Sequence, residues 1–357
     1  MKPRALFVGV HAGPYSSILP LERPLASLSP IFLLDGMALS LRRDAGLSCV
    51  DINAVIAGNG SLDRFLCAQG IQVILCGTSD GLMEGNLEES VRETATALAI
   101  PVFVVEDFPG NFRHCNRLRL DGLFVEDDSI CRLHESRGVS QGVAFGLGNP
   151  RYDALRQVDP VSLREKTRSQ LGLTREKVVL WIGQPDGGNS YKSLERILPT
   201  LLSSGAMLLF KAHPRDTFYA SGAYKGLLPS SDVCQDVTSV KDTISLCCAA
   251  DLVLTQFSSV GAEAGYLGTP VLYILFDDLG TAYLREHKGY EVVLWAREGC
   301  AFLLRSSDSI QEVFETALCS GAARSMVRQR FQYRFKSRPP SSSAIAAMVI
   351  RTLRGSA

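Results

Sequence analysis

The sequence has no excess of charge of either sign, because 37 basic residues balance 37 acidic ones over 357 residues. This balance argues against a general nucleic-acid-binding protein, which needs a strongly positive surface, so we expect no nucleic-acid partner. No apolar run is long enough for a membrane span, and the chain opens into a strand predicted at 5–10 rather than into a signal peptide. We therefore expect a cytoplasmic protein and leave open a peripheral contact with membranes or glycolipids.

Metal-binding cysteine patterns are also missing, although ten cysteines are present. No CxxC pair occurs and the spacing is irregular, which excludes a zinc site of the usual kind. Cys76, Cys247 and Cys248 lie in apolar runs, where cysteine acts as a small buried hydrophobe in a reducing compartment. No DxD-type motif stands in a loop suited to a metal, and the adjacent acidic pairs 127–128 and 277–278 are more typical of turns. We expect no metal and no other cofactor.

Apolar strands alternate with helical segments along the whole chain, which is typical of parallel α/β sheets. Since 357 residues exceed what one compact core usually holds, we predict two doubly wound, Rossmann-like domains, 1–155 and 156–335. A helix within 336–357 is expected to pack back towards the first domain. Strands are predicted at 5–10, 53–56, 73–76, 102–105, 123–125, 178–182, 207–211, 252–254 and 271–275, and helices at 37–45, 62–69, 84–98, 129–137, 162–171, 193–203, 243–249, 260–266, 310–318 and 341–353.

The most informative segment is 251–275, in which a strand, a turn, a helix and a second strand follow one another. The turn reads Thr255-Gln256-Phe257-Ser258-Ser259, so hydroxyls and backbone N–H groups meet at a helix N-terminus, where an anion such as a diphosphate is stabilised. Lys211-Ala212-His213-Pro214-Arg215 ends an earlier strand. Because ligands of open α/β sheets bind at the carboxyl ends of strands, these groups predict an anion site in a cleft that the two sheets face.

Four blocks in this order resemble nucleotide-sugar enzymes of the GT-B architecture. They are Gly148-Asn149-Pro150-Arg151-Tyr152-Asp153-Ala154-Leu155, Lys211 to Arg215, Ala250 to Ser259, and Gly261 to Ile274 with Glu263. The most similar patterns are those of CDP-glycerol glycerophosphotransferases, non-hydrolysing UDP-N-acetylglucosamine 2-epimerases and related glycosyltransferases. The resemblance covers roughly residues 146–280 and is only architectural before them.

The resemblance implies a GT-B fold whose second domain binds a nucleotide diphosphate-sugar donor. His213 and Arg215 and the hydroxyls of Ser258 and Ser259 would then hold the phosphates, and Glu263 would hold the ribose. Gly183 and Gln184 would lie near the base or the phosphates, and Gln256 belongs to the same turn. Capping is an equally simple role for the two serines, because it uses the same geometry as phosphate binding.

The first domain departs from each of these families. The glycerophosphotransferases carry a His-Gly-Thr-Pro-type block where this chain reads Glu106-Asp107-Phe108-Pro109-Gly110-Asn111, and the two epimerase blocks, His-X-Glu-Ala-Gly and Arg-X-Glu-Asn, are missing. Glu106 or Asp107, at a strand end, could act as the general base on an acceptor hydroxyl. His11, after the first strand, is the rival base. The loop 77–81 is either an acceptor-binding turn or a plain one.

These observations favour a metal-independent GT-B glycosyltransferase that moves a sugar from a nucleotide diphosphate to an acceptor hydroxyl. The acceptor would belong to a glycan, a glycolipid or a small metabolite. A nucleotide-sugar 2-epimerase and a polyol-phosphate transferase are the enzymatic alternatives. A binding protein that lost the chemistry of its first domain is the non-enzymatic alternative, because a fold does not determine a function.

Overall fold

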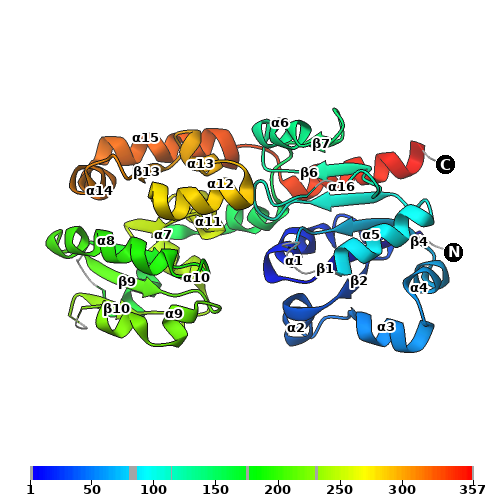
Figure 1. Ribbon diagram of the computed structural model, residues 1–357, viewed down its shortest axis with the longest axis horizontal. Helices are drawn as coiled ribbons and strands as arrows, with labels where there is room; N and C mark the ends of the chain where they lie inside the picture. The colour runs from blue at the N-terminus through cyan, green and yellow to red at the C-terminus, as the bar shows by residue number, and fades with distance from the viewer. Residues whose placement is uncertain (1–2, 80–86, 114, 174–176, 230–231, 356–357) are drawn as a thin grey trace. The chain divides into compact units, whose positions relative to one another are not determined.

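The computed structural model describes residues 3–79, 87–113, 115–173, 177–229 and 232–355. Its chain divides into two compact units (Figure 1), of which unit 1 comprises Met1–Asp153 with Pro339–Ala357 and unit 2 comprises Ala154–Arg338. Each unit is built on one parallel sheet with helices on both faces, as the alternation of apolar strands and helices predicts.

The sheet of unit 1 has seven parallel strands in the order β3-β2-β1-β4-β5-β6-β7. Its central strands are apolar and buried, and β1 and β4 are adjacent, so the order of the strands reverses between them. The strands are β1 (Arg4–Gly9), β2 (Ile31–Leu34), β3 (Val50–Asp51), β4 (Ile71–Cys76), β5 (Val102–Val105), β6 (Gly122–Phe124) and β7 (Ala144–Phe145).

The helices of unit 1 come from both ends of the chain. They are α1 (Ala12–Ile18), α2 (Gly36–Asp44), α3 (Ile52–Asn59), α4 (Leu62–Gln69), α5 (Leu87–Ala97), α6 (Asp128–Ser136) and α16 (Ser341–Gly355), with 3-10 turns at Leu19–Leu21 and Ala26–Leu28. A further 3-10 helix, Pro150–Gln157, begins in unit 1 and ends in unit 2. Ile345, Ala346 and Val349 of α16 are buried in one core cluster with Phe7 and Leu75 of the sheet. The C-terminal helix is therefore part of the core of unit 1.

The sheet of unit 2 has six parallel strands in the order β10-β9-β8-β11-β12-β13, which is the Rossmann-like order with its reversal between β8 and β11. The strands are β8 (Val178–Ile182), β9 (Met207–Lys211), β10 (Cys234–Asp236), β11 (Leu252–Thr255), β12 (Val271–Leu275) and β13 (Phe302–Arg305). The helices are α7 (Pro160–Gln170), α8 (Asn189–Ser203), α9 (Thr217–Ala220), α10 (Thr243–Ala249), α11 (Ser259–Leu267), α12 (Ala282–Lys288), α13 (Leu294–Arg297), α14 (Ile310–Cys319) and α15 (Gly321–Phe331), with a 3-10 turn at Ala223–Gly226 and π-helical turns at Asp277–Thr281 and Gln332–Lys336.

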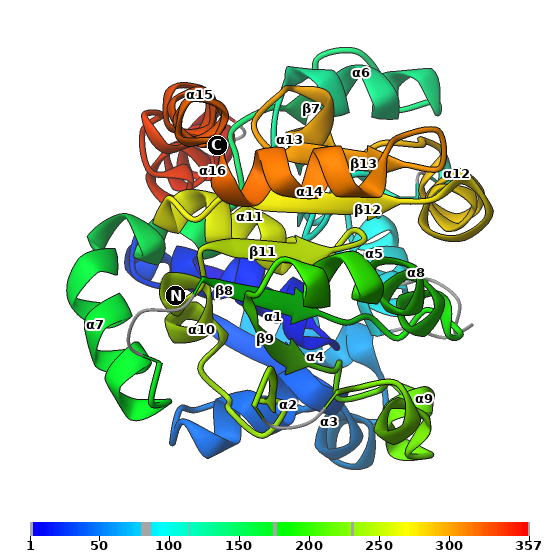
Figure 2. The same cartoon turned by 90° about the vertical axis from the view of Figure 1, so that its left-hand side faces the viewer.

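Helices cover both faces of this sheet (Figure 2). On one face α8 and α14 pack together over a core that contains Trp181, Leu254 and Phe314. On the other face α10 packs against α7 and α11. The loops that follow β8, β9 and β11 consequently gather at one edge of the sheet, where the carboxyl ends of parallel strands meet.

The predicted doubly wound α/β class is confirmed, and most predicted elements lie within a few residues of the observed ones. The strand predicted at 53–56 is wrong, because these residues lie in α3 (Ile52–Asn59). The Asp51 carboxylate accepts a hydrogen bond from the Asn53 backbone N–H at 2.9 Å, which caps a helix at that point. The start of the helix predicted at 84–98 lies outside the described residues.

In the parts of the chain that the structure describes, no helix combines the length and the hydropathy that crossing a bilayer requires. Six of the ten cysteines are buried, as expected of small hydrophobic side chains.

Candidate functional site

The reversal between β8 and β11 brings two of the predicted binding segments together in unit 2. Gly183 and Gln184 directly follow β8, and Gln256, Phe257 and Ser258 directly follow β11. The Phe257 backbone N–H donates a hydrogen bond to Gln184 Oε1 at 2.8 Å, which joins the two strand ends. Residues that are 73 positions apart in the sequence therefore form one surface.

The two glutamines of this surface are buried and bonded to other protein groups. Gln256 Nε2 donates to Ser193 Oγ at 2.7 Å, and the Gln184 backbone N–H donates to Ser190 Oγ at 2.9 Å. Both serines lie on the buried side of α8. The side chains of Gln184 and Gln256 fix the loop after β8 against the turn after β11, and their contact with a ligand stays a prediction.

Asp186 organises the glycine-rich loop between β8 and α8, a role that the sequence pattern did not indicate. Its carboxylate accepts hydrogen bonds from the Ser190 backbone N–H at 2.8 Å and from Ser190 Oγ at 3.0 Å. Burial raises the pKa of Asp186 to about 6, although these hydrogen bonds oppose the shift. Gly188, with a φ of 93°, ends this loop directly before α8 and provides no side-chain cap for the helix.

His213 follows β9 and is neutral at physiological pH. Burial, followed by the charge of Arg215, lowers the pKa of the His213 imidazole to about 4. His213 Nδ1 accepts a hydrogen bond from the Arg215 backbone N–H at 3.1 Å, so the ring hydrogen lies on Nε2. His213 can therefore donate one hydrogen bond, as a phosphate oxygen requires.

The two cations that flank His213 differ in their surroundings. The Arg215 side chain is exposed. Lys211 Nζ donates to the carbonyl oxygens of Val240 at 2.5 Å and of Thr238 at 3.3 Å, and burial lowers the pKa of this lysine. Lys211 thus holds the segment after β10, and Arg215 is the cation of this pair that lies open to a ligand.

Ser258 and Ser259 form the N-terminus of α11. Ser258 Oγ caps the helix by accepting a hydrogen bond from the Val260 backbone N–H at 3.2 Å, and Ser259 is the first helical residue. Both serines are half-buried, and so is Glu263 further along α11. An anion placed at this terminus would be stabilised by the helix dipole and by backbone N–H groups.

Unit 1 gathers its own set of polar side chains at the carboxyl ends of β1, β4 and β5. Asp107 Oδ1 accepts hydrogen bonds from Thr78 Oγ1 at 2.6 Å and from Asn111 Nδ2 at 2.8 Å. Asp107 Oδ2 lies 2.6 Å from where a Cβ on Gly13 would stand, so the carboxylate sits against the first turn of α1. His11 directly precedes that turn and is half-buried.

Glu106 has different surroundings from Asp107, although the two are adjacent. Its side chain is 1% exposed, and Oε1 accepts a hydrogen bond from the Phe112 backbone N–H at 2.9 Å. Nε2 of the buried His134, which lies on α6, is 2.7 Å from the same oxygen. Glu106 therefore anchors the loop that carries Asp107, and no sequence motif marked His134 as its partner.

The remaining candidate residues have structural contacts. Ser79 bonds to the Glu88 carboxylate, while Asp80 and Gly81 of the predicted 77–81 turn lie outside the described residues. Asp127 is a buried cap of α6, and Asp278 pairs with Arg196 at 2.8 Å. Over the described ranges, no three or more His, Cys, Asp or Glu side chains cluster as metal ligands would. Metal independence stays a prediction.

Comparison with protein families matches residues 126–338 to the model of the CDP-glycerol:poly(glycerophosphate) glycerophosphotransferases. Among curated protein sequences, no significant match is found.

Several solved structures share the fold over nearly the whole chain. HepE from Anabaena in complex with UDP and glucose is 15% identical, with 99% of each chain covered and a TM-score of 0.67. The UDP-GlcNAc 2-epimerase of Methanocaldococcus jannaschii in complex with UDP-GlcNAc and UDP is 15% identical, with 98% of this chain and 99% of that chain covered and a TM-score of 0.68. The wall teichoic acid polymerase TagF soaked with CDPG is 14% identical, with 100% and 90% covered and a TM-score of 0.59. Identities this low show the fold alone, and they confirm the predicted GT-B architecture.

Proposed function

We propose a reaction for this chain from one premise: the chain belongs to the CDP-glycerol:poly(glycerophosphate) glycerophosphotransferase family, whose model covers more than half of its residues. Membership in this family, together with the fold, confirms the prediction of a GT-B transferase of the nucleotide-sugar enzyme class. The transferred group, the acceptor and the residue roles below are our proposal.

Unit 2 binds the nucleotide diphosphate of the donor. The observation that carries this assignment is the neutral His213 at the end of β9, whose Nε2–H is oriented by the Arg215 backbone. The N-terminus of α11, with Ser258 and Ser259, offers further hydrogen-bond donors. Glu263 is assigned to the ribose, and the loop of Gly183 and Gln184 to the base or the phosphates.

The transferred group is a sugar, and Asp107 is the general base. Asp107 removes the proton from the acceptor hydroxyl, the acceptor oxygen forms a bond to the sugar carbon, and the nucleotide diphosphate leaves with the electron pair of the broken bond. The sugar carbon gains positive charge in the transition state, which a carboxylate favours. His213, Arg215 and the N-terminus of α11 stabilise the departing diphosphate without a metal.

Asp107 is preferred to Glu106 and His11 because of its contacts. Glu106 is buried against His134 and Phe112, so an acceptor does not reach its carboxylate. The Asp107 carboxylate accepts hydrogen bonds from Thr78 and Asn111, and Asp107 is only half-buried, so an acceptor can reach it. His11, before α1, is the second choice.

Transfer of a polyol phosphate is the second candidate, and the description of the matched family favours it. Residues 1–125 lie outside that match, and they include Asp107, which stands where the glycerophosphotransferases carry their His-Gly-Thr-Pro-type block. A phosphate group under attack is already anionic, so a neighbouring carboxylate repels it. This repulsion is our reason for placing sugar transfer first.

A thermal-shift screen with UDP-, CDP- and GDP-sugars and CDP-glycerol tests the donor assignment. We expect stabilisation by one nucleotide family and release of its nucleotide only when acceptor is added.

Asp107→Asn should bind the donor as well as wild type does and lose about 10²- to 10⁴-fold in turnover, the usual contribution of a general base. The exposed Asp44→Asn serves as the control. A folded protein that responds to none of these donors would contradict the proposal.

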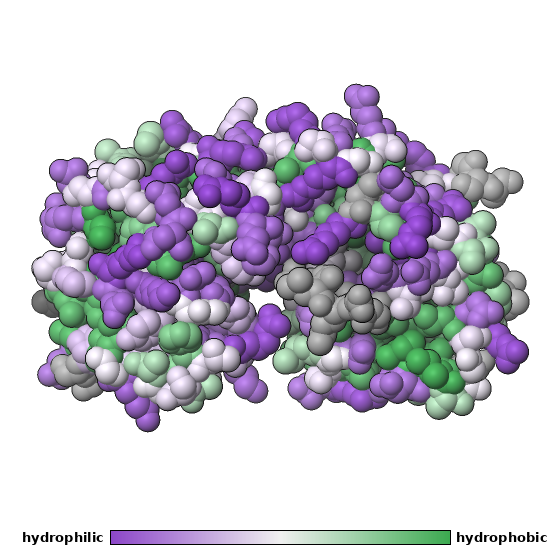
Figure 3. Space-filling model, viewed as in Figure 1, coloured by the Kyte–Doolittle hydropathy of each residue, from purple (hydrophilic) through white to green (hydrophobic). Residues whose placement is uncertain are grey.

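A lipid-linked acceptor would bring the protein to a membrane from the cytoplasmic side. In unit 1 the helices α2 and α3 expose apolar side chains, with Met37 54% and Ile56 56% exposed and Arg43 also exposed, and an apolar area lies over α3 in Figure 3. Such a surface suits peripheral contact. Flotation with anionic vesicles tests this part of the proposal, and a protein that stays entirely unbound would contradict it.

A further inference from the structure

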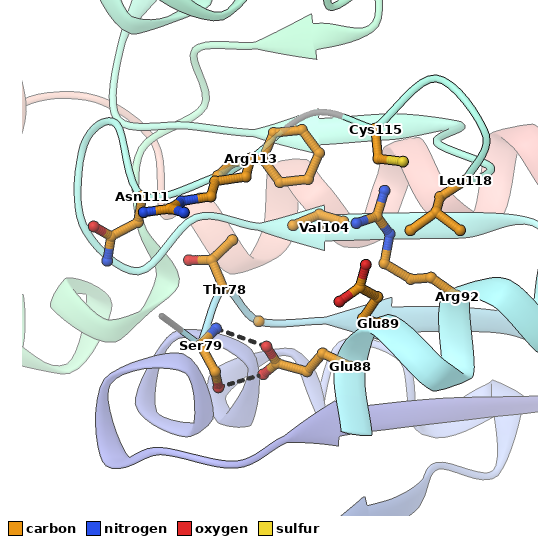
Figure 4. Close-up of a pocket in the computed structure, with 12 residues that line it drawn as sticks. Thr78, Ser79, Glu88, Glu89, Arg92, Val104, Asn111, Arg113, Cys115 and Leu118 are labelled. Atoms are coloured by element: carbon orange, nitrogen blue, oxygen red, sulfur yellow. Dashed lines mark hydrogen bonds between the residues drawn. The ribbon is translucent and has the colours of Figure 1, made fainter. Parts of the chain in front are cut away.

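A cavity of about 190 Å³ lies in unit 1 beside the loop that carries Asp107 (Figure 4). Four parts of the chain contribute residues to its wall, namely the residues that follow β4, the first turns of α5, Val104 of β5, and residues between Asn111 and Leu118. The residues used here are Thr78, Ser79, Glu88, Arg92, Asn111 and Arg113.

Arg92 is the unexplained group of this cavity. It is only 8% exposed, and its Nε and Nη2 atoms are buried with no hydrogen-bond partner among the residues that the structure describes. Its guanidinium carbon lies 5.3 Å from the centre of the Phe112 ring. Buried polar groups are normally hydrogen-bonded. An unsatisfied guanidinium that lines a cavity therefore points to a ligand that binds there and accepts hydrogen bonds.

The positions of Nε and Nη2 in Arg92 indicate which kind of group would accept both hydrogen bonds. Nε and Nη2 lie on the same edge of the planar guanidinium and point their hydrogens in parallel. A group with two equivalent oxygens accepts both hydrogen bonds at once, as a carboxylate or a phosphate does. Exposed Arg113 adds a second positive charge to the wall.

The acidic side chains of the wall limit the charge of the anionic group that the cavity can hold. Glu88 Oε2 and Oε1 accept from the Ser79 backbone N–H at 2.6 Å and from Ser79 Oγ at 2.9 Å, and Glu89 is exposed. Two carboxylates beside two arginines leave the cavity without a net charge. A singly charged anion is therefore favoured over a phosphate monoester with two charges.

We propose that this cavity is an acceptor subsite in which Arg92 binds a carboxylate or a phosphodiester of the acceptor. The inference rests on the proposed transferase function and adds the class of acceptor to it. Thr78 and Asn111 line the same cavity and hydrogen-bond the Asp107 carboxylate at 2.6 and 2.8 Å. An anion held by Arg92 would thus place a nearby hydroxyl of the same molecule beside the proposed base.

The test is a titration of the whole protein with acetate, dimethyl phosphate and neutral methyl acetate at constant ionic strength, followed by ligand-observed NMR. We expect at least one anion to bind and methyl acetate not to bind. We expect Arg92→Gln to lower the affinity for the anion by about tenfold or more. Exposed Arg132→Gln on α6 is the matched control and should leave the affinity unchanged. Binding of acetate would favour an acceptor with a carboxylate, such as an acidic sugar, and binding of dimethyl phosphate would favour a phosphodiester chain.

Equal anion affinity in wild type and Arg92→Gln, or no preference over methyl acetate, would overturn the subsite. If Arg92→Gln does not fold, Arg92→Lys replaces it, because lysine keeps the charge and lacks the planar fork. An unchanged affinity in Arg92→Lys would overturn the two-oxygen contact. An anion response that depends on Arg92 in a protein that binds no nucleotide-linked donor would support the subsite and overturn the proposed function.

Discussion

His213 is predicted to bind the donor as a neutral hydrogen-bond donor, because the pKa of its imidazole is lowered to about 4. Since the free protein is already neutral at this position above pH 5, affinity for a nucleotide diphosphate-sugar should be flat between pH 6 and 8. It should rise only towards lower pH, where the bound diphosphate favours protonation of the ring. Isothermal titration at several pH values measures this profile.

Substitution of His213 separates its hydrogen bond from its charge. His213→Gln places an amide N–H near the position of Nε2 and should keep most of the affinity. His213→Ala should lose about 10- to 100-fold, as expected for a hydrogen bond to a charged group. If wild-type affinity falls steeply from pH 6 to pH 7.5 and His213→Gln abolishes that dependence, the imidazolium form is the one that binds.

At the scale of single residues, the sequence offered Glu106 and Asp107 as candidate bases but could not choose between them. Neighbouring side chains at the end of a strand point in opposite directions, and the sequence does not reveal which direction is the interior. The structure distinguishes the surroundings of the two side chains, since His134 of α6, 28 residues further along the chain, lies 2.7 Å from Glu106. That contact depends on how α6 packs, which no local pattern specifies.

The helix α11 depends on a close approach at Gly261. A Cβ at this position would stand 2.2 Å from the buried Tyr273 hydroxyl of β12, so any side chain must displace the helix or the ring. Gly261→Ala should destabilise unit 2 by about 1–3 kcal/mol. It should also lower the affinity for the proposed nucleotide-linked donor, because Ser258 and Ser259 move with the helix. Thermal unfolding and donor titration measure both effects.

Gly321→Ala in α15 is the matched control, because a Cβ there meets nothing within 4 Å. Alanine also has the higher helix propensity, so this control should be neutral or slightly stabilising. Equal effects of the two substitutions would show that helix propensity, rather than the contact with Tyr273, determines the outcome.

At the scale of elements, long apolar segments were predictable and short ones were not. The strands at 102–105, 178–182, 207–211 and 271–275 agree with the structure because they are continuous, buried apolar runs. By contrast, β10 (Cys234–Asp236) has three residues, two of them polar, and pairs with β9. The 53–56 prediction failed because Ile52 and Val55 are buried with helical spacing, which four residues do not reveal.

At the scale of the whole molecule, each unit has its own sheet and its own buried core, and such units can unfold independently. Both tryptophans of the chain, Trp181 and Trp295, are buried in unit 2, whereas α16 contributes Ile345 to the core of unit 1. Ile345→Ala should therefore destabilise unit 1 by about 2–5 kcal/mol through the cavity that it leaves. In denaturant, the transition followed by far-UV circular dichroism should broaden or split, while the transition followed by tryptophan fluorescence should stay in place. A shift of both transitions by the same amount would mean that the two units unfold as one cooperative structure.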